Sequence, residues 1–167
     1  YTSAVGDFAT RKAIADDLNS RYQAGIRPED LFIGCGAAPE LCAVFSALAV
    51  PGGEILAIAP YFPEYKPFVE EAGLKFKVVP ADVPSFQINF EALGKMITEN
   101  TQAIILNSPN NPSGVVYTLE TLEKLSALLG EKVARYGHPI YLVSDEPYRE
   151  LTYGVEAPWI PAIYRDT

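Results

Sequence analysis

Four polar loops hold the residues whose types and spacing could do chemistry, and each follows an apolar run typical of a buried strand. The loop at residues 107–114 reads NSPNNPSG and follows the run at 103–106. Its prolines restrict the backbone, so its Asn side chains can present amide groups to a flat polar ligand at fixed positions. The other three loops are GCGAAPEL after residues 31–33, PYFPEY after residues 55–59 and SDEPYRE after residues 140–143.

These three loops offer different groups. Gly36, Ala37 and Ala38 come before a proline that suits the first turn of a helix, so free backbone N–H groups there form a seat for a phosphate. PYFPEY offers aromatic faces, and SDEPYRE offers the carboxylate of Asp145 with Tyr148 three residues later. A phosphate seat, an aromatic face, amides and an acid at the ends of neighbouring strands describe a site for a phosphorylated heteroaromatic cofactor.

Strands and helices alternate along the chain, which predicts an α/β fold with a mainly parallel sheet and right-handed crossovers. The alternating LKFKVV predicts a more exposed strand than AIIL does. The strand candidates are 31–34, 54–59, 74–79, 102–107 and 139–144. Helical core stripes are marked by Ile14, Leu18 and Tyr22; by Leu41, Val44, Phe45 and Leu48; by Phe90, Leu93 and Ile97; and by Leu122, Leu125, Leu129 and Val133.

Composition excludes some classes of partner. With 167 residues, 49% of them hydrophobic, the chain can bury one sizeable core. The net charge of −8 argues against nucleic acid or an anionic membrane as partner, because both need basic patches. No apolar run reaches transmembrane length and no basic-then-apolar leader opens the chain, so we expect a cytoplasmic enzyme.

Metal, disulfide and nucleotide chemistry find little support in the sequence. Cys35 and Cys42 indicate neither a disulfide framework nor a metal site, and we expect them to be small buried apolar residues. His138, the only histidine, precedes Pro139 and a strand candidate, so we interpret it as a loop residue rather than a catalytic base. A nucleotide-binding G-x-G-x-x-G motif is broken in GCGAAP.

The order and spacing of NSPNNPSG, SDEPY, GCGAA and PYFPEY resemble those of the class I/II (aspartate aminotransferase-like, fold type I) pyridoxal-phosphate enzymes, over nearly the whole chain. The resemblance implies a three-layer domain with helices on both faces of the sheet, with pyridoxal 5'-phosphate as cofactor. It further implies amino acid and 2-oxo acid substrates and a homodimer. We therefore expect residues 1–167 to be part of one cofactor-binding large domain, without its C-terminal part and without the small domain.

The resemblance also assigns roles to single residues. Asp145 matches the aspartate that pairs with the pyridine nitrogen and keeps it protonated, and the alternative role is a helix N-cap. Asn111 and Tyr148 match the residues that hydrogen-bond the phenolic oxygen of the cofactor, although Asn111 would also suit plain turn chemistry. Phe62 matches the aromatic residue that stacks on the ring, and Tyr61 is its rival.

Two further matches concern the cofactor phosphate. Gly36, Ala37 and Ala38 match the phosphate-binding turn, with two alanines where the family often has a hydroxyl-bearing residue. Tyr1, five residues before Gly6, matches a tyrosine that reaches across the dimer to the phosphate of the neighbouring subunit's cofactor.

The resemblance also predicts two cis peptide bonds, at Asn111-Pro112 and Ala59-Pro60. X-Pro bonds prefer trans by only about 0.5–1 kcal/mol, and the family uses cis proline to aim these loops at the cofactor.

The Schiff-base lysine of the family follows the SDEPY strand, and no lysine of this chain does so. Every lysine comes before Asp145: Lys12, Lys66, Lys75, Lys77, Lys95, Lys124 and Lys132. We therefore expect a fragment of an amino acid aminotransferase that is inactive by itself. The alternatives are another fold type I reaction, such as a β-carbon–sulfur lyase or a cyclopropane-forming synthase, and the aminotransferase-like sensing domain of a transcription regulator.

Overall fold

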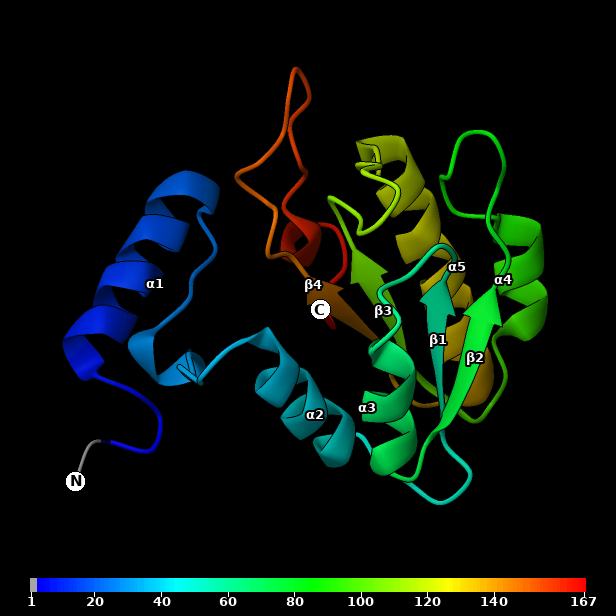
Figure 1. Cartoon of the computed structure of the whole chain (residues 1–167), viewed down its shortest axis with the longest axis horizontal. Helices are drawn as coiled ribbons and strands as arrows, with labels where there is room; N and C mark the ends of the chain where they lie inside the picture. Colours follow the sequence, from blue (N-terminus) through cyan, green and yellow to red (C-terminus); the bar gives the residue numbers. More distant parts are fainter. Residues whose placement is uncertain (1–2) are drawn as a thin grey trace. The chain divides into compact units, whose positions relative to one another are not determined.

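The structure is a computed structural model that describes residues 3–167 (Figure 1). Tyr1, the predicted cross-dimer residue, lies outside the described residues. The chain divides into two compact units, Tyr1–Leu41 and Cys42–Thr167. The division falls within helix α2 (Ala37–Ala47).

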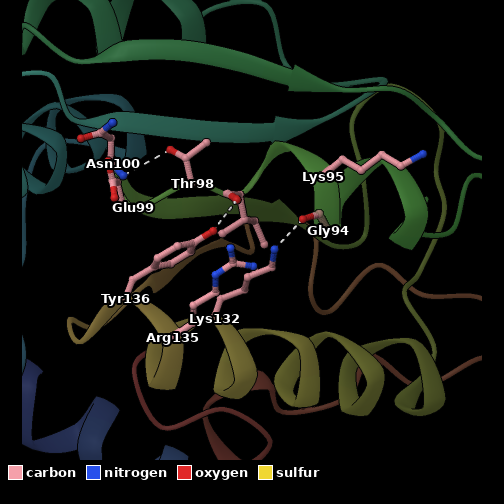
Figure 2. A pocket seen from close by; sticks show the side chains of 9 residues that line it. Gly94, Lys95, Thr98, Glu99, Asn100, Lys132, Arg135 and Tyr136 are labelled. Atoms are coloured by element: carbon pink, nitrogen blue, oxygen red, sulfur yellow. Dashed lines mark hydrogen bonds between the residues drawn. The ribbon is translucent and has the colours of Figure 1, made fainter.

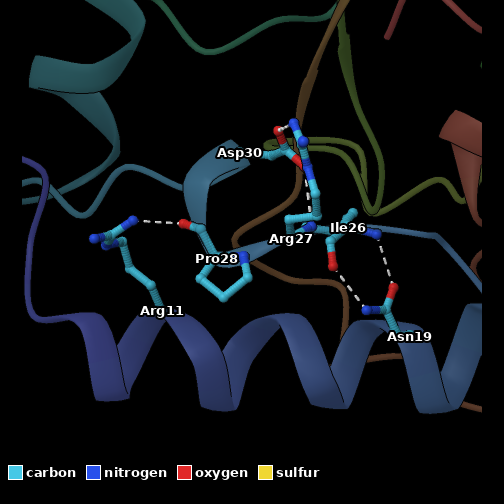
Figure 3. Close-up of polar contacts among 6 residues, drawn as sticks. All are labelled: Arg11, Asn19, Ile26, Arg27, Pro28 and Asp30. Carbon is cyan, nitrogen blue, oxygen red and sulfur yellow. Dashed lines mark hydrogen bonds and ion pairs between the residues drawn. The ribbon is translucent and has the colours of Figure 1, made fainter.

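The first unit contains helix α1 (Phe8–Tyr22) and a short 3₁₀ helix η1 (Pro28–Asp30). Two side chains of α1 hold the chain that returns along it (Figure 3). Arg11 is buried and its Nη1 donates to the Pro28 carbonyl oxygen at 2.6 Å. The Asn19 amide bonds both backbone groups of Ile26, at 2.7 and 2.8 Å. These contacts explain why a polar face of α1 is covered.

Two predictions for this unit are wrong. Residues 31–34 are not a strand, because a strand needs a hydrogen-bonded neighbour and beyond the η1 turn this segment makes one backbone bond, from Ile33 to Val5 at 3.2 Å. The helix predicted from Ile14, Leu18 and Tyr22 exists, but Ile14 is 40% exposed. The buried residues of α1 are Arg11 and Ala15, so the apolar stripe is not its covered face.

The second unit is built on a four-stranded parallel sheet with the strand order β2-β1-β3-β4. The strands are β1 (Glu54–Ile58), β2 (Lys75–Val79), β3 (Thr101–Asn107) and β4 (Tyr141–Asp145). They confirm the four later strand candidates to within two residues at each end. Because all the strands run in one direction, their carboxyl ends share one edge of the sheet.

Helices lie on both faces of this sheet, which confirms the predicted three-layer α/β fold (Figure 1). Helices α4 (Phe90–Met96) and α5 (Leu119–Tyr136) cover one face, and α3 (Tyr65–Glu71) lies on the other. A second 3₁₀ helix, η2 (Ile160–Ala162), lies near the end of the chain. The core on the α5 face contains Leu56, Ile58, Ile104, Leu106 and Leu142 of the strands with Leu93, Leu122, Leu125 and Leu129 of the helices.

The sequence explains the limits of α5 and the burial of the strands. Thr118 caps the start of α5, where its hydroxyl accepts from the Thr121 N–H at 3.1 Å. Gly137 ends the helix with a φ of +77°, a left-handed conformation that favours glycine. Strand β1 is buried at every position, whereas β2 has exposed positions, as the LKFKVV pattern predicts.

The predicted cis bonds at Ala59-Pro60 and Asn111-Pro112 are confirmed. Val83-Pro84 and Ser108-Pro109 are also cis, and neither was expected from the sequence. A search of residues 3–167 for a helix long and apolar enough to cross a membrane finds none.

Candidate functional site

The carboxyl edge of the sheet brings three of the four predicted loops together. The Asn110 amide, in the loop after β3, donates to the Pro60 carbonyl oxygen in the loop after β1 at 3.2 Å. The Asn107 amide, at the end of β3, donates to the Asp145 carbonyl oxygen at the end of β4 at 2.9 Å. Buried side chains of NSPNNPSG therefore tie the loops of β1, β3 and β4 to one another.

The three asparagines of NSPNNPSG have different roles. Asn107 uses both ends of its amide, since its Oδ1 also accepts from the Asn111 N–H at 2.6 Å. Asn110 stabilises the turn, because its Oδ1 accepts from the N–H and the hydroxyl of Ser113 at 3.1 and 2.7 Å. The Asn111 side chain makes no hydrogen bond within residues 3–167. Asn111 is thus the asparagine whose amide is available to a ligand.

Asp145, the last residue of β4, is held on one side by Tyr65. The Tyr65 hydroxyl, buried at the start of α3, donates to Asp145 Oδ2. Burial, and then the hydrogen bond to Asp145 and the charge of this carboxylate, raise the pKa of Tyr65 well above its usual value, so the hydroxyl stays a donor. The other carboxylate oxygen of Asp145 has no hydrogen-bond partner in the described part of the chain.

Glu146, the acid next to Asp145, is used within the protein, and Asp145 does not have the alternative role of a helix N-cap. Glu146 uses both carboxylate oxygens within the protein, accepting from Ser144 at 2.7 Å and from Arg149 at 2.8 Å. No helix begins after Asp145 before η2 in the described residues, so Asp145 is not a helix N-cap. Of the two acids in SDEPY, Asp145 alone keeps an oxygen for a ligand.

Asn111 and Tyr148 line one cavity of about 410 Å³ between the loop after β3 and the segment after β4. The Tyr148 hydroxyl, like the Asn111 amide, makes no hydrogen bond to the described residues. Asp145 and Phe62 are not among the lining residues, which are Pro109, Asn110, Asn111, Pro112, Gly114, Tyr148, Leu151 and Tyr153.

The two aromatic candidates of PYFPEY pack against different partners. The Phe62 ring lies edge-on to Tyr65, the residue that holds Asp145, with 5.6 Å between ring centroids. The Tyr61 ring packs in the same manner on Phe76 of β2, at 5.1 Å. This arrangement favours Phe62 over Tyr61 as the aromatic neighbour of Asp145.

The predicted phosphate seat lies in the first unit. Gly36 directly precedes α2 with a φ of +130°, a conformation that L-residues rarely adopt, and Ala37 and Ala38 begin the helix. The first N–H groups of a helix have no partner within it, so this turn has the donors that a phosphate needs.

A second cavity, of about 630 Å³, lies at the opposite end of the strands, beside the residues that lead into β3 (Figure 2). Lys132 donates to the Gly94 carbonyl oxygen at 2.6 Å and Tyr136 to that of Ile97 at 3.2 Å. These side chains tie α5 to the end of α4. The lining residues are Gly94, Lys95, Ile97, Thr98, Glu99, Asn100, Lys132, Arg135 and Tyr136, and none is a predicted site residue.

His138 lies in the loop after α5, as predicted, with Nε2 2.8 Å from the Glu99 carbonyl oxygen. The prediction for the cysteines is wrong in its burial, because Cys35 is exposed and Cys42 is half-buried. Both are free thiols. Neither cysteine nor His138 is among the residues that line the cavity at the Asn111 loop.

Together the fold and the site define an α/β cofactor-binding domain with its polar groups at the carboxyl edge of a parallel sheet. The chain belongs to the class I and II aminotransferase family, whose family model matches residues 1–163.

Individual relatives agree with the family. The chain is 32% identical to a probable aspartate/prephenate aminotransferase of Aquifex aeolicus (strain VF5), over 99% of this chain and 41% of that protein. It is 34% identical to an aspartate aminotransferase of Thermotoga maritima, over 92% of this chain and 39% of that protein. The chain therefore spans about two fifths of the length of these relatives.

Solved structures give the same result. An amino transferase from Eubacterium rectale superposes with a TM-score of 0.98 at 47% identity, over 100% of this chain and 42% of that chain. The aspartate aminotransferase of Thermus thermophilus with maleate superposes with a TM-score of 0.88 at 32% identity, over 98% of this chain and 41% of that chain.

The described residues fit pyridoxal phosphate, the cofactor of this family, by the chemistry of their donors and acceptors. Asp145 has an oxygen available for a pyridinium N–H. The uncommitted Asn111 amide and Tyr148 hydroxyl line one cavity and suit a phenolic oxygen. In the first unit, taken by itself, the N–H groups after Gly36 suit a phosphate.

Sequence reasoning missed the residues that support this arrangement, above all Tyr65 and Asn107. A signal for Tyr65 was present, because Tyr65 and Val69 have the i, i+4 spacing of a buried helix face. A buried tyrosine hydroxyl needs a hydrogen-bond partner, and the acid in SDEPY was available. No local signal distinguishes Asn107 from Asn111.

Proposed function

We propose that the protein to which this chain belongs is a pyridoxal-phosphate-dependent amino acid aminotransferase, which moves an amino group between an amino acid and a 2-oxo acid. The observation that carries the proposal is that some polar groups at the carboxyl edge of the sheet are hydrogen-bonded within the protein and others are available to a ligand. Asp145, Asn111 and Tyr148 keep polar atoms available there, while the polar residues around them are used within the protein. Family membership supplies the reaction class.

Each residue would contribute a separate interaction. When bound, the cofactor supplies an electron sink for the substrate carbon from which a proton is lost. The Asp145 carboxylate would hold a proton at the pyridine nitrogen, and Tyr65 keeps that carboxylate in place. Asn111 and Tyr148 would donate to the phenolic oxygen, and Phe62 would pack against the ring.

The phosphate would bind to the backbone N–H groups at the start of α2. Gly36, Ala37 and Ala38 offer no side-chain hydroxyl, so the backbone must supply the donors in this turn. Since this chain spans about two fifths of the length of its relatives, we place the Schiff-base lysine, the rest of the large domain and the small domain elsewhere in the full protein.

The proposal extends to assembly and location. We propose a cytoplasmic homodimer in which Tyr1 contacts the phosphate of the neighbouring subunit's cofactor. Two measurements on the full-length protein, with and without Tyr1→Phe, test the statements about the dimer. They are the size of the protein in solution and its affinity for pyridoxal phosphate. A monomer that binds the cofactor normally would contradict them.

The test of the reaction uses the full-length protein with pyridoxal phosphate and pairs of an amino acid and a 2-oxo acid. Aspartate with 2-oxoglutarate is the first pair, because several relatives are named aspartate aminotransferases. Asp145→Asn keeps the shape but removes the charge, and we expect kcat to fall by more than about 100-fold. Asp16→Asn, which removes an exposed charge on α1, is the control.

Two results would contradict this proposal. If Asp145→Asn bound the cofactor and kept near wild-type turnover, Asp145 would have a structural role. If the wild-type protein bound the cofactor but exchanged no amino group with any pair, it would catalyse another reaction of this fold.

A further inference from the structure

The turn that carries Tyr148 is closed both by the backbone and by an ion pair that is largely shielded from solvent. The Arg149 N–H donates to the Glu146 carbonyl oxygen at 3.2 Å, the bond of a β-turn with Pro147 and Tyr148 at its centre. Arg149 Nη1 lies 2.8 Å from Glu146 Oε2, and the two side chains are 11% and 16% exposed. Asp145, the last residue of β4, directly precedes the turn, and Tyr148 lies within it, so the positions of both candidate residues depend on the shape of the turn.

Arg149 also fastens the turn to a later segment of the chain. Its Nη2 donates to the Ala157 carbonyl oxygen at 3.0 Å and its Nη1 to that of Pro158 at 3.2 Å. Its guanidinium lies over the Trp159 ring, 5.1 Å from the centroid. One planar group thus joins the turn at 146–149 to residues 157–159. Lysine has neither the planar fork of donors nor the stacking surface to replace it.

Glu146 is committed to this arrangement on its other side as well. Its Oε1 accepts from the Ser144 hydroxyl at 2.7 Å, inside strand β4. The carboxylate therefore connects the strand to Arg149 and has no oxygen left for a ligand. Asp145, one residue earlier, keeps an oxygen available. The structural acid and the ligand-binding acid are adjacent but separate.

We infer that Glu146 and Arg149 are positioning residues, which hold Asp145 and Tyr148 in the geometry that receives the cofactor. This inference rests on the proposed function, because it concerns the same site. Neither side chain needs to touch the cofactor. The ion pair acts through the turn, whose centre includes Tyr148, one of the residues that line the cavity at the Asn111 loop.

The test compares Arg149→Lys with wild type in the full-length protein. Arg27→Lys is a matched control, because Arg27 and Asp30 form an ion pair of the same i, i+3 spacing at 2.7 Å, but Arg27 is 73% exposed (Figure 3). Arg149→Met would leave the half-buried Glu146 carboxylate without its cation and risks misfolding, so Arg149→Lys, which keeps the charge, is the deciding variant.

The first measurement is hydrogen exchange without cofactor. In Arg149→Lys the amides of Arg149 and Leu151, which donate to the Glu146 and Tyr148 carbonyl oxygens, should exchange at least about tenfold faster, whereas Arg27→Lys should leave them unchanged. The second is affinity: we expect Arg149→Lys to bind pyridoxal phosphate about tenfold more weakly, which corresponds to about 1.4 kcal/mol. The third is the pH at which the absorbance of the bound cofactor changes, which should shift if Tyr148 is displaced.

The outcomes separate this inference from the proposed function. If the pair only stabilised the fold, Arg149→Lys would lower the unfolding midpoint and leave the affinity and the pH profile at wild-type values. That result, or unchanged exchange at Arg149 and Leu151, overturns the positioning role while wild-type cofactor binding upholds the proposed function. Failure of the wild-type protein to bind pyridoxal phosphate overturns the proposed function, and the positioning role with it.

Discussion

Replacing Tyr65 by phenylalanine removes the one hydroxyl that the described chain supplies to the Asp145 carboxylate and changes little else. The Tyr65 side chain is buried, and its ring lies edge-on to Phe62 at 5.6 Å. A phenylalanine ring can keep that contact. The substitution therefore isolates the hydrogen bond between a buried phenol and a carboxylate.

The expected cost follows from the exposure of the two partners. A hydrogen bond to a charged group contributes about 1.5–3 kcal/mol. Because Asp145 is half-buried rather than buried, water can partly replace the lost donor, so we expect the low end. Tyr65→Phe should lower the free energy of unfolding by about 1.5 kcal/mol at pH 7.

Urea unfolding measures this cost, and a double-mutant cycle with Asp145→Asn assigns it to the pair. Tyr136→Phe is the control, because that hydroxyl donates to a neutral carbonyl, Ile97, at 3.2 Å. It should cost less, about 0.5–1 kcal/mol. If Tyr65→Phe cost no more than Tyr136→Phe, or showed no coupling to Asp145, the hydroxyl would not support the carboxylate.

Three more predictions concern pH, the sheet and the lysines. Burial raises the pKa values of Tyr65 and Tyr117, so the stability that their protonated forms contribute is complete below pH 10 and is lost as pH rises above it. Each should add up to about 1.4 kcal/mol per pH unit to the decline measured by urea unfolding above pH 10, and Tyr117→Phe should remove one share; an equal slope in that variant would contradict the assignment. Burial is the largest influence on Glu54 and acts to raise the pKa of its carboxyl group, but the hydrogen bonds from Lys77 and Thr98 outweigh burial, so the pKa is lowered. The stability that ionised Glu54 contributes is therefore present above pH 4.5 and is lost as the pH falls below it. Lys77→Met should then cost about 2 kcal/mol at pH 7 and less at pH 3.5, and a cost independent of pH would count against the ion pair. Finally, this chain mixed with pyridoxal phosphate and borohydride should show no trapping at a specific lysine, because all its lysines lie on α1, α3, β2, α4 or α5; stoichiometric trapping at one lysine that depended on Asp145 would refute this.

Local pattern alone determined much of this protein. Apolar runs predicted β1 to β4, the 3.6-residue period predicted α1, α2, α4 and α5 but not α3, and turn residues such as Gly137 mark where α5 ends. The loops NSPNNPSG and SDEPY indicated the site because polar residues directly after parallel strands must meet at one edge. These signals depend on a residue and its neighbours in the chain, so no distant contact was needed to read them.

Tertiary structure decided which polar residue does what. Asn107, Asn110 and Asn111 are alike in sequence, but hydrogen bonds across the sheet edge commit the first two and leave the third available. Asp145 and Glu146 are separated in the same way by Tyr65 and Arg149, residues up to 80 positions away. Residues 31–34 have the composition of a strand but no neighbouring strand among the described residues. Except for Glu146, whose partners Ser144 and Arg149 are within three residues, the outcome depends on a partner from another part of the chain. A hydrogen bond or a strand pairing exists only when both members are in place.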